Sequence, residues 1–491
     1  MTPIKKEPDI ILFVNEIPDD PETIRRDLNE YGKKNKKSFR LAIIRDTRRI
    51  EIGEAKEYAS DIIYLSCDFS DPIKIQKALL PYQNEILAVT CRSEINIDSF
   101  SKLVPNVPYL RTPTSESLDW AIQKTMMRKR FNAYDKKITP KFSIVKNFSK
   151  ETIKNVKEKV GFPLVVKPSG LASSLLISVC YYEEELEQTL EESFKVIRKI
   201  YKENDRKKEP ELLVEQFMEG EMFSIDGYVS SKGKVYFCPL VKVKTGKQIG
   251  FDDFFGYQRI LPANIKKSSS EKAQEVAKKG VHALGLRSVT VHIELMRLED
   301  GWKVIEIGPR MGGYRHLMYQ LSYGINHALN DILIRIPQKP IIPRKVKGHT
   351  AVFLFYAKKE GRLKAIKGVK KVQELESFKE IKINKKIGDV CKFAKNGGKF
   401  VCNLVLFNQD RSKLLADIRR MEKTLKIITA NSPAKLVFKP TDKKIARDTG
   451  IPESAELSSP SEAILETMYE GKTKITVEKI DHKKVYEEIF R

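Results

Sequence analysis

Short apolar runs alternate with amphipathic stretches over residues 9–112 of the chain. Apolar runs of four to eight residues indicate strands, and apolar residues spaced three or four apart indicate helices. Strands that alternate with helices predict a small parallel α/β layer. No G-x-G-x-x-G pattern follows the first strand, so dinucleotide binding is not favoured. The expected strands are Asp9–Val14, Phe39–Ile44, Asp61–Leu65 and Glu85–Cys91, and the expected helices are Asp20–Tyr31 and Pro72–Pro81.

A mixed order of strands and helices is expected in the middle of the chain. Ser115 can cap a helix over Glu116–Phe131, and Pro140 opens the next segment. The predicted strands there are Phe142–Val145, Leu164–Lys167, Leu176–Cys180 and Leu212–Phe217, and the predicted helices are Ser149–Val160 and Glu183–Tyr201.

The later part of the chain contains a predicted helix, Ser270–Leu284, followed by a predicted hairpin. In that hairpin a strand ends at Glu294, the chain turns at Glu299-Asp300-Gly301, and a second strand covers Trp302–Ile307. A proline-rich break at Pro337–Pro343 precedes a strand-rich unit over residues 349–439, which we expect to end in an amphipathic helix at Ser412–Leu425. Beyond about residue 440 the sequence is polar.

Length and composition limit the class of protein. The 491 residues suffice for roughly three domains. An apolar content of 41% is ordinary for a globular protein, and no apolar run approaches the length of a membrane span. The apolar stretch near the N-terminus is too short for a signal peptide, so we expect a cytoplasmic protein. Six scattered cysteines with no C-x-x-C pair argue against a zinc site or a disulfide framework.

The net charge of +25 raises the question of nucleic-acid binding. Lysine is spread through every region, and no basic tail concentrates the charge. We therefore do not favour nucleic acid as a partner. A lysine-rich surface attracts anionic nucleotides and small carboxylates equally well.

The hairpin carries two acids, Glu294 and Glu306, on neighbouring strands. Two carboxylates held side by side repel each other unless a cation lies between them, which favours Mg²⁺. Arg310 follows four residues after Glu306 and precedes a Gly-Gly pair. A metal, a fixed cation and an exposed backbone turn are typical of a phosphoryl-transfer site. The alternative at this point is a surface hairpin with two solvated acids.

Two further segments are candidates for nucleotide contacts. Lys167 ends an apolar strand and precedes a loop of small residues that contains Ser173 and Ser174, whose hydroxyls and amides can donate to phosphate oxygens. The strand that begins at Leu212 runs into a turn with acids at Glu219 and Glu221. A plain loop and a buried strand with an acidic turn remain alternatives for these two segments.

The order and spacing of these features resemble the ATP-grasp superfamily. The features are a helix lysine, a strand-end Lys-Pro with a small-residue loop, the segment Val214-Glu-Gln-Phe-Met-Glu-Gly-Glu221, and the Glu294…Glu306-x-x-x-Arg310 hairpin. The similarity is to the branch that contains biotin carboxylase, carbamoyl-phosphate synthetase and many amino-acid ligases, and it covers about residues 115–440.

The resemblance implies a multidomain fold of the α/β and α+β classes. An N-terminal parallel α/β layer would precede an ATP-grasp fold and a strand-rich C-terminal domain. The implied boundaries are 1–114 for the N-terminal domain, 115–340 for the ATP-grasp domain with a small lobe at about 141–222, 345–440 for the C-terminal domain, and 441–491 for a polar appendix.

The resemblance also assigns roles to individual residues. Lys124 and Lys167 would contact ATP phosphates, Glu294 and Glu306 would bind Mg²⁺, and Arg310 would steady the substrate carboxylate or the transition state. Arg259 would be a second carboxylate clamp. The nucleotide itself would contact the hinge residues Glu215, Gln216, Phe217 and Met218, the ribose acid Glu221, the phosphate-loop residues Ser173 and Ser174, and the apolar walls Met296 and Ile305.

Two positions depart from the family pattern. Gly308 stands where the family has Asn, so one oxygen ligand is lost and a second metal would be held more weakly or through water. The phosphate loop is poorer in glycine, with Leu175 and Leu176 where smaller residues are common. His292 and His316 lie near the motif, where lone histidines are more often structural.

The function that the resemblance implies is an ATP-dependent carboxylate–amine ligase that forms an amide through an acyl phosphate, on an amino acid or a similar small carboxylate. ATP and Mg²⁺, with Mn²⁺ as a substitute, would be the cofactors. The partners would be a small-molecule carboxylate and an amine, with no membrane, and a homodimer is compatible with this. The alternatives are a bicarbonate-using carboxylase or carbamoyl-transfer enzyme, a catalytically degenerate ATP-binding protein, and a nucleic-acid binder.

Overall fold

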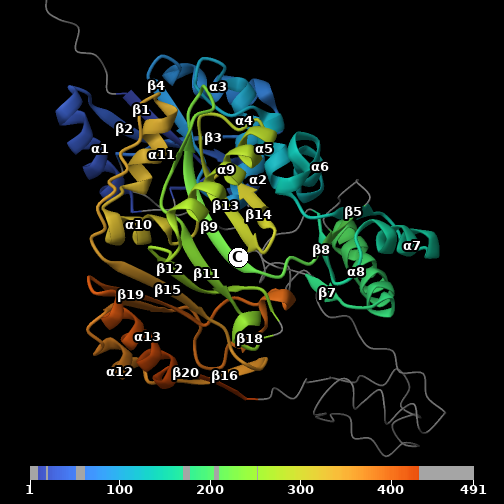
Figure 1. Cartoon of the computed structure of the whole chain (residues 1–491). Helices are drawn as coiled ribbons and strands as arrows, with labels where there is room; N and C mark the ends of the chain where they lie inside the picture. Colours follow the sequence, from blue (N-terminus) through green and yellow to red (C-terminus); the bar gives the residue numbers. More distant parts are fainter. Residues whose placement is uncertain are drawn as a thin grey trace, which may run out of the picture.

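The computed structural model describes residues 9–17, 20–50, 61–169, 177–203, 210–251 and 253–430. Ser173, Ser174 and the expected appendix at 441–491 lie outside these ranges. The N-terminal layer lies at one end of the molecule and the C-terminal strands at the other, with a large sheet between them (Figure 1). A small lobe of strands and helices projects to one side of that sheet (Figure 1).

The N-terminal layer is a four-stranded parallel sheet in the order β3-β2-β1-β4. This confirms the expected parallel α/β layer. Its first and third helices each begin with an aspartate cap followed by proline, Asp20-Pro21 and Asp71-Pro72, a combination that favours a helix start. The strands are β1 (Asp9–Val14), β2 (Phe39–Asp46), β3 (Ile63–Cys67) and β4 (Ile86–Thr90), and the helices are α1 (Pro21–Asn35), α2 (Thr47–Ile50), α3 (Pro72–Leu79) and α4 (Ile97–Leu103).

The predicted single helix over Glu116–Phe131 is wrong, because the chain forms two helices, α5 (Ser115–Ile122) and α6 (Lys124–Asp135). Thr114, rather than Ser115, caps α5 by accepting from the Ser117 amide. Gln123 is extended between the helices, and the Lys124 amide donates to the Ser169 carbonyl at 3.4 Å. The break therefore lets α6 begin against the end of a small-lobe strand.

The small lobe contains a four-stranded antiparallel sheet in the order β5-β8-β6-β7. The long helix α8 buries Leu186, Leu190 and Phe194 against it, at the four-residue spacing of one helix face. The elements are β5 (Phe142–Val145), α7 (Lys150–Lys159), β6 (Leu164–Pro168), β7 (Ser178–Cys180), α8 (Glu183–Glu203) and β8 (Leu212–Gln216).

The central sheet has nine strands in the order β14-β13-β9-β11-β12-β15-β19-β17, with β10 paired to β9. It continues without interruption across the proline-rich break, since β12 pairs with β15. The strands are β9 (Glu221–Val229), β10 (Val235–Phe237), β11 (Val241–Thr245), β12 (Gly256–Leu261), β13 (Val289–Leu298), β14 (Gly301–Gly308), β15 (His349–Phe355), β17 (Phe378–Ile383) and β19 (Cys402–Asn408).

The two faces of the central sheet are covered by different helices. On β13, Val291, Ile293 and Leu295 pack on α9 (Lys267–Ala283) with α6 behind it. The alternate residues of β13 point to the opposite face, which α10 (Arg315–Tyr323) and α11 (His327–Arg335) cover in part. That second face carries the polar side chains described below.

A three-stranded sheet, β18-β16-β20, completes the C-terminal region. The expected final helix is present as α13, but a strand, β20, follows it and pairs with β16, so the prediction that this unit ends in a helix is wrong. The elements are β16 (Gly361–Lys367), α12 (Val369–Gln373), β18 (Val390–Cys391), α13 (Arg411–Thr424) and β20 (Lys426–Ala430). Short 3-10 helices lie at Leu80–Tyr82, Glu94–Asn96, Val104–Asn106, Lys136–Ile138, Lys247–Ile249 and Ala394–Asn396.

Within the described ranges, no helix is both long and apolar enough to cross a lipid bilayer. All six cysteines are free and buried, as expected for small apolar side chains.

Candidate active site

Glu294 and Glu306 occupy directly opposite positions of the antiparallel pair β13–β14. Directly opposite residues point to the same face of a sheet, so both carboxylates lie on the face that α10 and α11 cover in part. The expected strand end at Glu294 is wrong, because β13 continues to Leu298 and Glu294 lies in mid-strand. A position inside a paired strand holds a side chain more firmly than one at a strand end.

A bulge follows the acid pair. Leu295 pairs with Val304, so Ile305 has no partner in β13. The Ile305 carbonyl instead accepts a hydrogen bond from the Arg128 guanidinium at 2.6 Å. Met296 and Ile305, the expected adenine walls, are both half-buried beside the acids. Helix α6 is thereby attached to the strand that carries Glu306.

Arg310 is held by an acid from the N-terminal layer. Its Nε donates to the Glu94 carboxylate at 2.6 Å, and its second guanidinium nitrogen donates to the Met311 carbonyl at 2.9 Å. A Cβ added at Gly308 would lie 3.2 Å from the Glu94 carboxylate. Gly308, which stands where the resemblance implies Asn, therefore leaves room for a carboxylate from the N-terminal layer.

Arg310 lies within electrostatic range of both acids. Burial alone would raise the pKa of Glu294, but His292, Arg310 and Arg259 outweigh it and hold that pKa at about 2. Burial lowers the pKa of Arg310, but the Glu94 and Glu306 carboxylates outweigh it and raise it. The structure thus brings Glu294, Glu306 and Arg310 together, as the sequence interpretation required.

Lys124 lies at the first position of α6, with its ammonium 3.7 Å from the Glu306 carboxylate. The side chain is only 16% exposed. A lysine next to one of the paired acids can neutralise either that acid or a phosphate that binds beside it.

Lys167 and Arg128 share the carboxylate of Glu215. Lys167 lies 2.6 Å from Glu215, and the Arg128 guanidinium bonds the other oxygen. Burial would raise the pKa of Glu215, but Arg128 and Lys167 hold it at about 2. Burial, together with the neighbouring Arg128, lowers the pKa of Lys167 despite the carboxylate. The cluster carries one more positive charge than negative, which suits an anion such as a phosphate.

The expected adenine hinge is partly occupied by internal bonds. The Gln216 amide donates to the Lys141 carbonyl at 2.9 Å, and the Phe217 amide donates to the Pro163 carbonyl at 3.0 Å. Among the described residues, no hydrogen bond is donated by the Met218 amide. Of these hinge amides, that of Met218 is therefore the one available to a nitrogen of the adenine ring. The Glu215 side chain instead contacts Lys167, the expected phosphate ligand.

Glu221, the expected ribose acid, begins β9 and binds two cations on neighbouring strands. Lys242 on β11 lies 2.5 Å from it, and Arg297 on β13 forms a second ion pair. Its hydrogen bond from Lys242 and the two nearby cations lower its pKa. The carboxylate is 34% exposed, so it remains open to a ligand.

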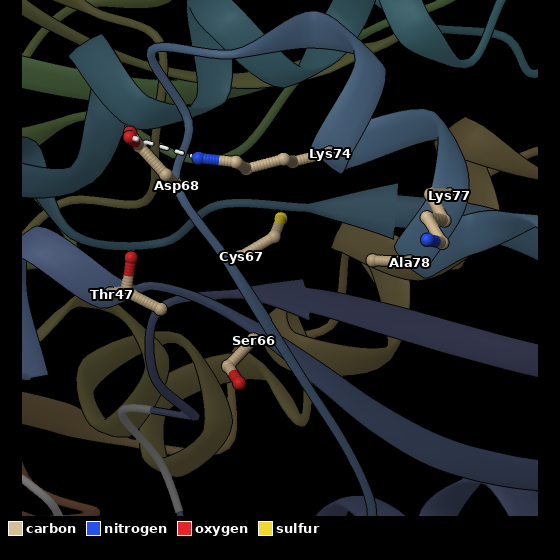
Figure 2. A pocket seen from close by; sticks show the side chains of 7 residues that line it. All are labelled: Thr47, Ser66, Cys67, Asp68, Lys74, Lys77 and Ala78. Atoms are coloured by element: carbon tan, nitrogen blue, oxygen red, sulfur yellow. Dashed lines mark ion pairs between the residues drawn. The ribbon is translucent and has the colours of Figure 1, made fainter.

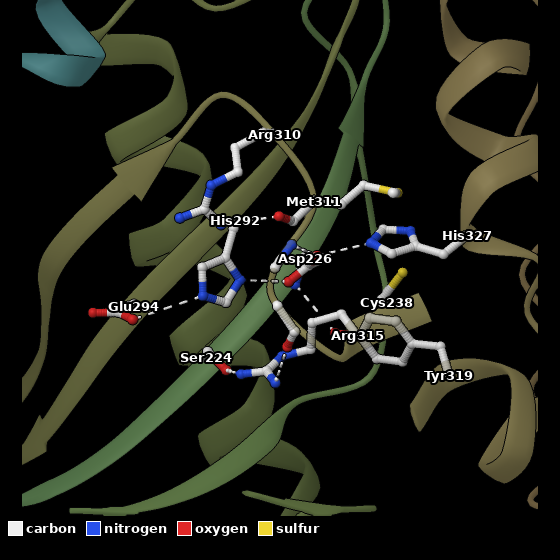
Figure 3. Close-up of polar contacts among 12 residues, drawn as sticks. Ser224, Asp226, Cys238, His292, Glu294, Arg310, Met311, Arg315, Tyr319 and His327 are labelled. Atoms are coloured by element: carbon white, nitrogen blue, oxygen red, sulfur yellow. Dashed lines mark hydrogen bonds and ion pairs between the residues drawn. The ribbon is translucent and has the colours of Figure 1, made fainter. Parts of the chain in front are cut away.

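A buried network centred on Asp226 lies behind Glu294 (Figure 3). Asp226 interacts with His292 at 2.7 Å and His327 at 2.8 Å, and it accepts from the Gly312 amide at 2.8 Å. The other nitrogen of His292 lies 3.7 Å from Glu294. Asp226 therefore connects a metal-ligand candidate to the loop that carries Arg310.

Arg259, the expected second clamp, lies on β12 with its guanidinium bonded to the Gly256 carbonyl at 2.9 Å. Glu294 and Arg259 influence each other's pKa, so Arg259 belongs to the same charged region.

The acid pair fits a magnesium ion that also binds phosphate oxygens and water. Among the described residues, no three histidine, cysteine or acidic side chains are grouped to hold a metal by themselves. Mg²⁺ commonly binds through one or two carboxylates together with substrate phosphates, and Glu294 and Glu306 supply such a pair.

A cavity of about 460 Å³ lies elsewhere, in the N-terminal layer near the ends of β2 and β3 (Figure 2). One of its two lysines, Lys74, lies 4.0 Å from Asp68. Burial raises the pKa of the Cys67 thiol in its wall to about 11. Among the described residues that line it, Asp68 is the only acid, so they form no pair comparable to Glu294 and Glu306. Its lining residues are Thr47, Ser66, Cys67, Asp68, Lys74, Lys77 and Ala78.

Several residues of the site were not expected from the sequence. The sequence could have pointed to Glu94, because it follows β4 and ligands bind beyond the carboxyl ends of parallel strands. It could also have pointed to Asp226, since Ser224 and Asp226 alternate with apolar residues on β9. Nothing in the sequence points to the roles of Arg128 and Arg315, because their partners are far away in sequence.

Comparison with protein families identifies two parts of the chain. An ATP-grasp domain matches residues 160–317, and the L-amino acid ligase C-terminal domain 2 matches residues 353–430.

Individual proteins similar to this chain carry ligase and transferase names. An alanine–anticapsin ligase of Bacillus subtilis is 27% identical, covering 46% of this chain and 49% of its own length. A formate-dependent phosphoribosylglycinamide formyltransferase of Wolinella succinogenes is 30% identical, covering 39% of this chain and 46% of its own length. The chain thus spans about half the length of these curated relatives.

The fold is also found among solved structures. The crystal structure of an L-amino acid ligase from Bacillus licheniformis superposes with a TM-score of 0.64 at 18% identity, covering 87% of this chain and all of that one. At this identity the likeness concerns the fold, and it confirms the predicted fold class.

Proposed function

The chain carries an ATP-grasp domain followed by an L-amino acid ligase C-terminal domain, and from this premise we propose that it is an ATP-dependent carboxylate–amine ligase. The substrates would be an amino acid or similar small carboxylate and an amine. The product would be an amide, formed through an acyl phosphate, with release of ADP and phosphate.

The observation that carries the proposal is the convergence on one sheet face of Glu294, Glu306 and Arg310, with Lys124 beside them. The acids are cross-strand partners, Lys124 comes from α6, and Arg310 lies in the loop that directly follows β14. Phosphoryl transfer needs little covalent chemistry from a protein and depends on positioning and charge stabilisation. This arrangement provides both.

The residues would act in two successive steps. In the first, Arg310 holds the donor carboxylate so that its oxygen attacks the γ-phosphorus, while Lys124 and Lys167 stabilise the phosphate charge and ADP leaves. In the second, the amine nitrogen attacks the acyl carbon, the bond to the phosphate oxygen breaks, and the nitrogen gives up a proton. Phosphate leaves and the amide remains.

Glu294 and Glu306 would hold Mg²⁺, or Mn²⁺ in its place, and the ion would supply charge stabilisation for the phosphates. The Glu94 carboxylate fills the space beside Gly308, where the family pattern has a further oxygen ligand. We infer that a single well-held ion, rather than two, is the working state.

Isotope transfer tests the proposal directly. A donor labelled with ¹⁸O in its carboxylate should pass one labelled oxygen to the released phosphate, which mass spectrometry detects. Glu306→Gln should abolish ADP formation without unfolding the protein, as circular dichroism would show. ADP release in Glu306→Gln at the rate of the unaltered protein would refute the assignment.

The same assay separates the alternatives. Turnover that depends on bicarbonate and needs no amino acid would indicate a carboxylase or carbamoyl-transfer enzyme. ATP binding by calorimetry, with no turnover across a broad panel of donors and acceptors, would indicate a degenerate nucleotide-binding protein.

A further inference from the structure

The net positive charge of the chain is concentrated in its C-terminal region. Residues 353–430 hold 20 lysines and arginines against eight aspartates and glutamates, which is a net charge of +12 out of the chain's +25. These residues are the part that matches the ligase C-terminal domain, and they make up less than a fifth of the chain. An excess of this size in so short a region indicates a strongly basic surface.

Part of this excess lies on one side of the three-stranded sheet β18-β16-β20, at the end of the molecule away from the N-terminal layer (Figure 1). Arg362 and Lys367 on β16 are exposed, and so is Lys364, the extra residue of a bulge in that strand. Lys367 lies directly opposite Lys426 of β20, which is exposed as well. Arg362 lies directly opposite Ala430, and even spacing along β20 puts Ala430 on the same side as Lys426. We call this side, with Arg362, Lys364, Lys367 and Lys426, the basic face.

The opposite side of the sheet is buried. Leu363 of β16 is 1% exposed. Ile366 and Ile427 pack on the core cluster that includes Leu414 and Met421 of α13. Helix α13 therefore lies against that side of the sheet, and the basic face is directed away from the core.

The acids of the same region interact elsewhere. Glu376 pairs with Lys413 at 2.9 Å, and Glu360 accepts from a backbone amide at 2.8 Å. On the basic face, Arg362 and Lys426 donate to backbone carbonyls at 3.0 and 3.3 Å. Among the described residues, none of the four cations of the basic face forms an ion pair with an acid. A counter-charge for this face must therefore come from outside the described residues.

The position of two of the lysines makes such a counter-charge valuable. Like charges directly opposite each other on paired strands destabilise the pairing, and Lys367 and Lys426 are such a pair. Lys242 on β11 shows the usual arrangement, since it lies 2.5 Å from Glu221 on the neighbouring strand β9. An acid bound between Lys367 and Lys426 would replace repulsion by attraction.

Apolar side chains on the basic face narrow the chemistry of its partner. Val390 of β18 lies directly opposite Arg362 and is 43% exposed. Ile428, two residues from Lys426, is half-buried and points to the same side. Nucleic-acid surfaces typically use arginine and stacked aromatic rings, whereas this face is mainly lysine with aliphatic side chains. It therefore suits an acidic polypeptide that also carries apolar residues.

The chain itself contains a segment of this composition. Residues 451–470 include five glutamates and no lysine or arginine. These residues lie outside the described ranges, and their sequence alternates acidic with apolar positions such as Ile464, Leu465 and Met468. The five acids are Glu453, Glu456, Glu462, Glu466 and Glu470.

The segment is tethered close to the basic face. Ala430, the last described residue, ends β20 opposite Arg362. Residues 431–450 connect it to the acidic segment, and twenty residues can span up to about 66 Å. The basic face is shorter, since five residue steps from Arg362 to Lys367 correspond to about 17 Å. A tether of this length costs little closure entropy and gives an effective concentration of roughly millimolar, which favours binding within one chain.

We propose that residues 451–470 bind to the basic face of the same chain. The glutamates of the segment offset the charge of Arg362, Lys364, Lys367 and Lys426, and its apolar side chains cover Val390 and Ile428. This contact is independent of the proposed ligase activity.

Lysine reactivity in the full chain tests the contact. Limited acetylation with acetic anhydride, read by mass spectrometry, gives the rate at which each lysine reacts. In the unaltered protein at 0.1 M salt, we expect Lys364, Lys367 and Lys426 to react at least threefold more slowly than in the triple variant Glu462→Gln, Glu466→Gln, Glu470→Gln. The difference should vanish at 1 M salt, because the screening length falls from about 10 Å to about 3 Å.

Two controls separate the contact from a general effect of charge. Lys379 on β17 is exposed in the same region but belongs to the central sheet, so its rate should be equal in both proteins. The matched variant Glu478→Gln, Glu487→Gln, Glu488→Gln removes the same charge from residues 471–491. It should leave the slow reaction of the basic-face lysines unchanged, and circular dichroism should show that every variant is folded.

Carbodiimide cross-linking identifies the occupant. This reagent joins a carboxylate to an adjacent amine, and a mixture of ¹⁴N- and ¹⁵N-labelled protein distinguishes links within one chain from links between chains. We expect links from residues 451–470 to Lys364, Lys367 or Lys426 within single chains.

Three results would overturn the proposal. Equal acetylation of the basic-face lysines in the unaltered protein and the 462/466/470 variant would show that the segment does not cover them. Links with mixed isotopes alone would assign the face to a second copy of the chain. Protection that persists in the 462/466/470 variant, and that nuclease treatment removes, would assign it to nucleic acid.

Discussion

Two buried carboxylates beside the candidate site, Glu215 and Asp226, have different kinds of partners. Glu215, at the edge of the small lobe, is shared by the Lys167 ammonium and the Arg128 guanidinium. Asp226, in the central sheet, is shared by two histidine rings and the Gly312 amide. Both side chains are almost fully buried, at 3% and 0% exposure.

The partners show what each acid does. Glu215 balances one of two fixed cations, so it controls the charge next to the expected phosphates. Asp226 is occupied by three donors that point in different directions, so it controls where the Arg310 loop and His292 lie. Burial would raise the pKa of Asp226, but His292 and His327 outweigh it and lower it. Glu215 thus controls the local charge, whereas Asp226 controls the positions of the Arg310 loop and His292.

Removing the charge of Glu215 should have the largest effect. In Glu215→Gln two buried cations lose their carboxylate, which should lower the free energy of unfolding by about 3–5 kcal/mol. Denaturant unfolding followed by circular dichroism measures this. A second change, Lys167→Met in the same chain, should recover part of the loss because it removes one uncompensated cation. A loss below about 1 kcal/mol would show that Glu215 does not balance these charges.

Acid should remove the same contribution gradually. The pKa of Glu215 is lowered from 4.5 to about 2, so its stabilisation is complete above pH 4.5 and is lost as pH falls toward 2. This difference corresponds to roughly 3 kcal/mol. The unaltered protein should lose stability between pH 5 and 2 more steeply than Glu215→Gln. Parallel curves for the two proteins, measured by urea unfolding at each pH, would contradict the low pKa.

The contact by which Asp226 positions the Gly312 loop can be tested with a substitution that changes no charged residue. A Cβ at Gly312 would lie 2.4 Å from the Nδ1 atom of His292, whereas a Cβ at Gly313 has nothing within 4 Å. Gly312→Ala should therefore displace the loop, costing about 1–3 kcal/mol of stability and most of the ligase activity. Gly313→Ala is the matched control and should leave ADP formation nearly unchanged. Equal activities of the two variants would show that the Gly312–Asp226 contact does not position the loop.

The parts of the site that the sequence predicts are those set by local rules. The pairing of Glu294 with Glu306 follows from strand alternation and a short turn, and both were expected. The extent of β13 was not, because pairing with β9 lengthens that strand beyond what its own residues indicate. Likewise, the break at Gln123 depends on Ser169, which is distant in sequence.

The residues that sequence reasoning missed are joined by contacts between distant segments. Arg128 and Glu215 are 87 positions apart, and Glu94 and Arg310 are 216 apart. No periodicity relates such positions, since the fold alone brings them together. The fold class was predictable because it depends on repeated local patterns. The two shared carboxylates, Glu215 and Asp226, depend on how the small lobe, α6, α11 and the central sheet dock.

Glu221 offers the sharpest comparison with Glu215, although its expected effect is the smallest. It too is shared by two cations, Lys242 and Arg297, but it is 34% exposed. Water screens exposed pairs, so Glu221→Gln should cost less than about 1 kcal/mol of stability. If Glu221 also receives the ribose, the KM for ATP should rise a few-fold, with a smaller change in kcat. A stability loss as large as that of Glu215→Gln would show that the number of partners, rather than burial, makes a shared carboxylate important.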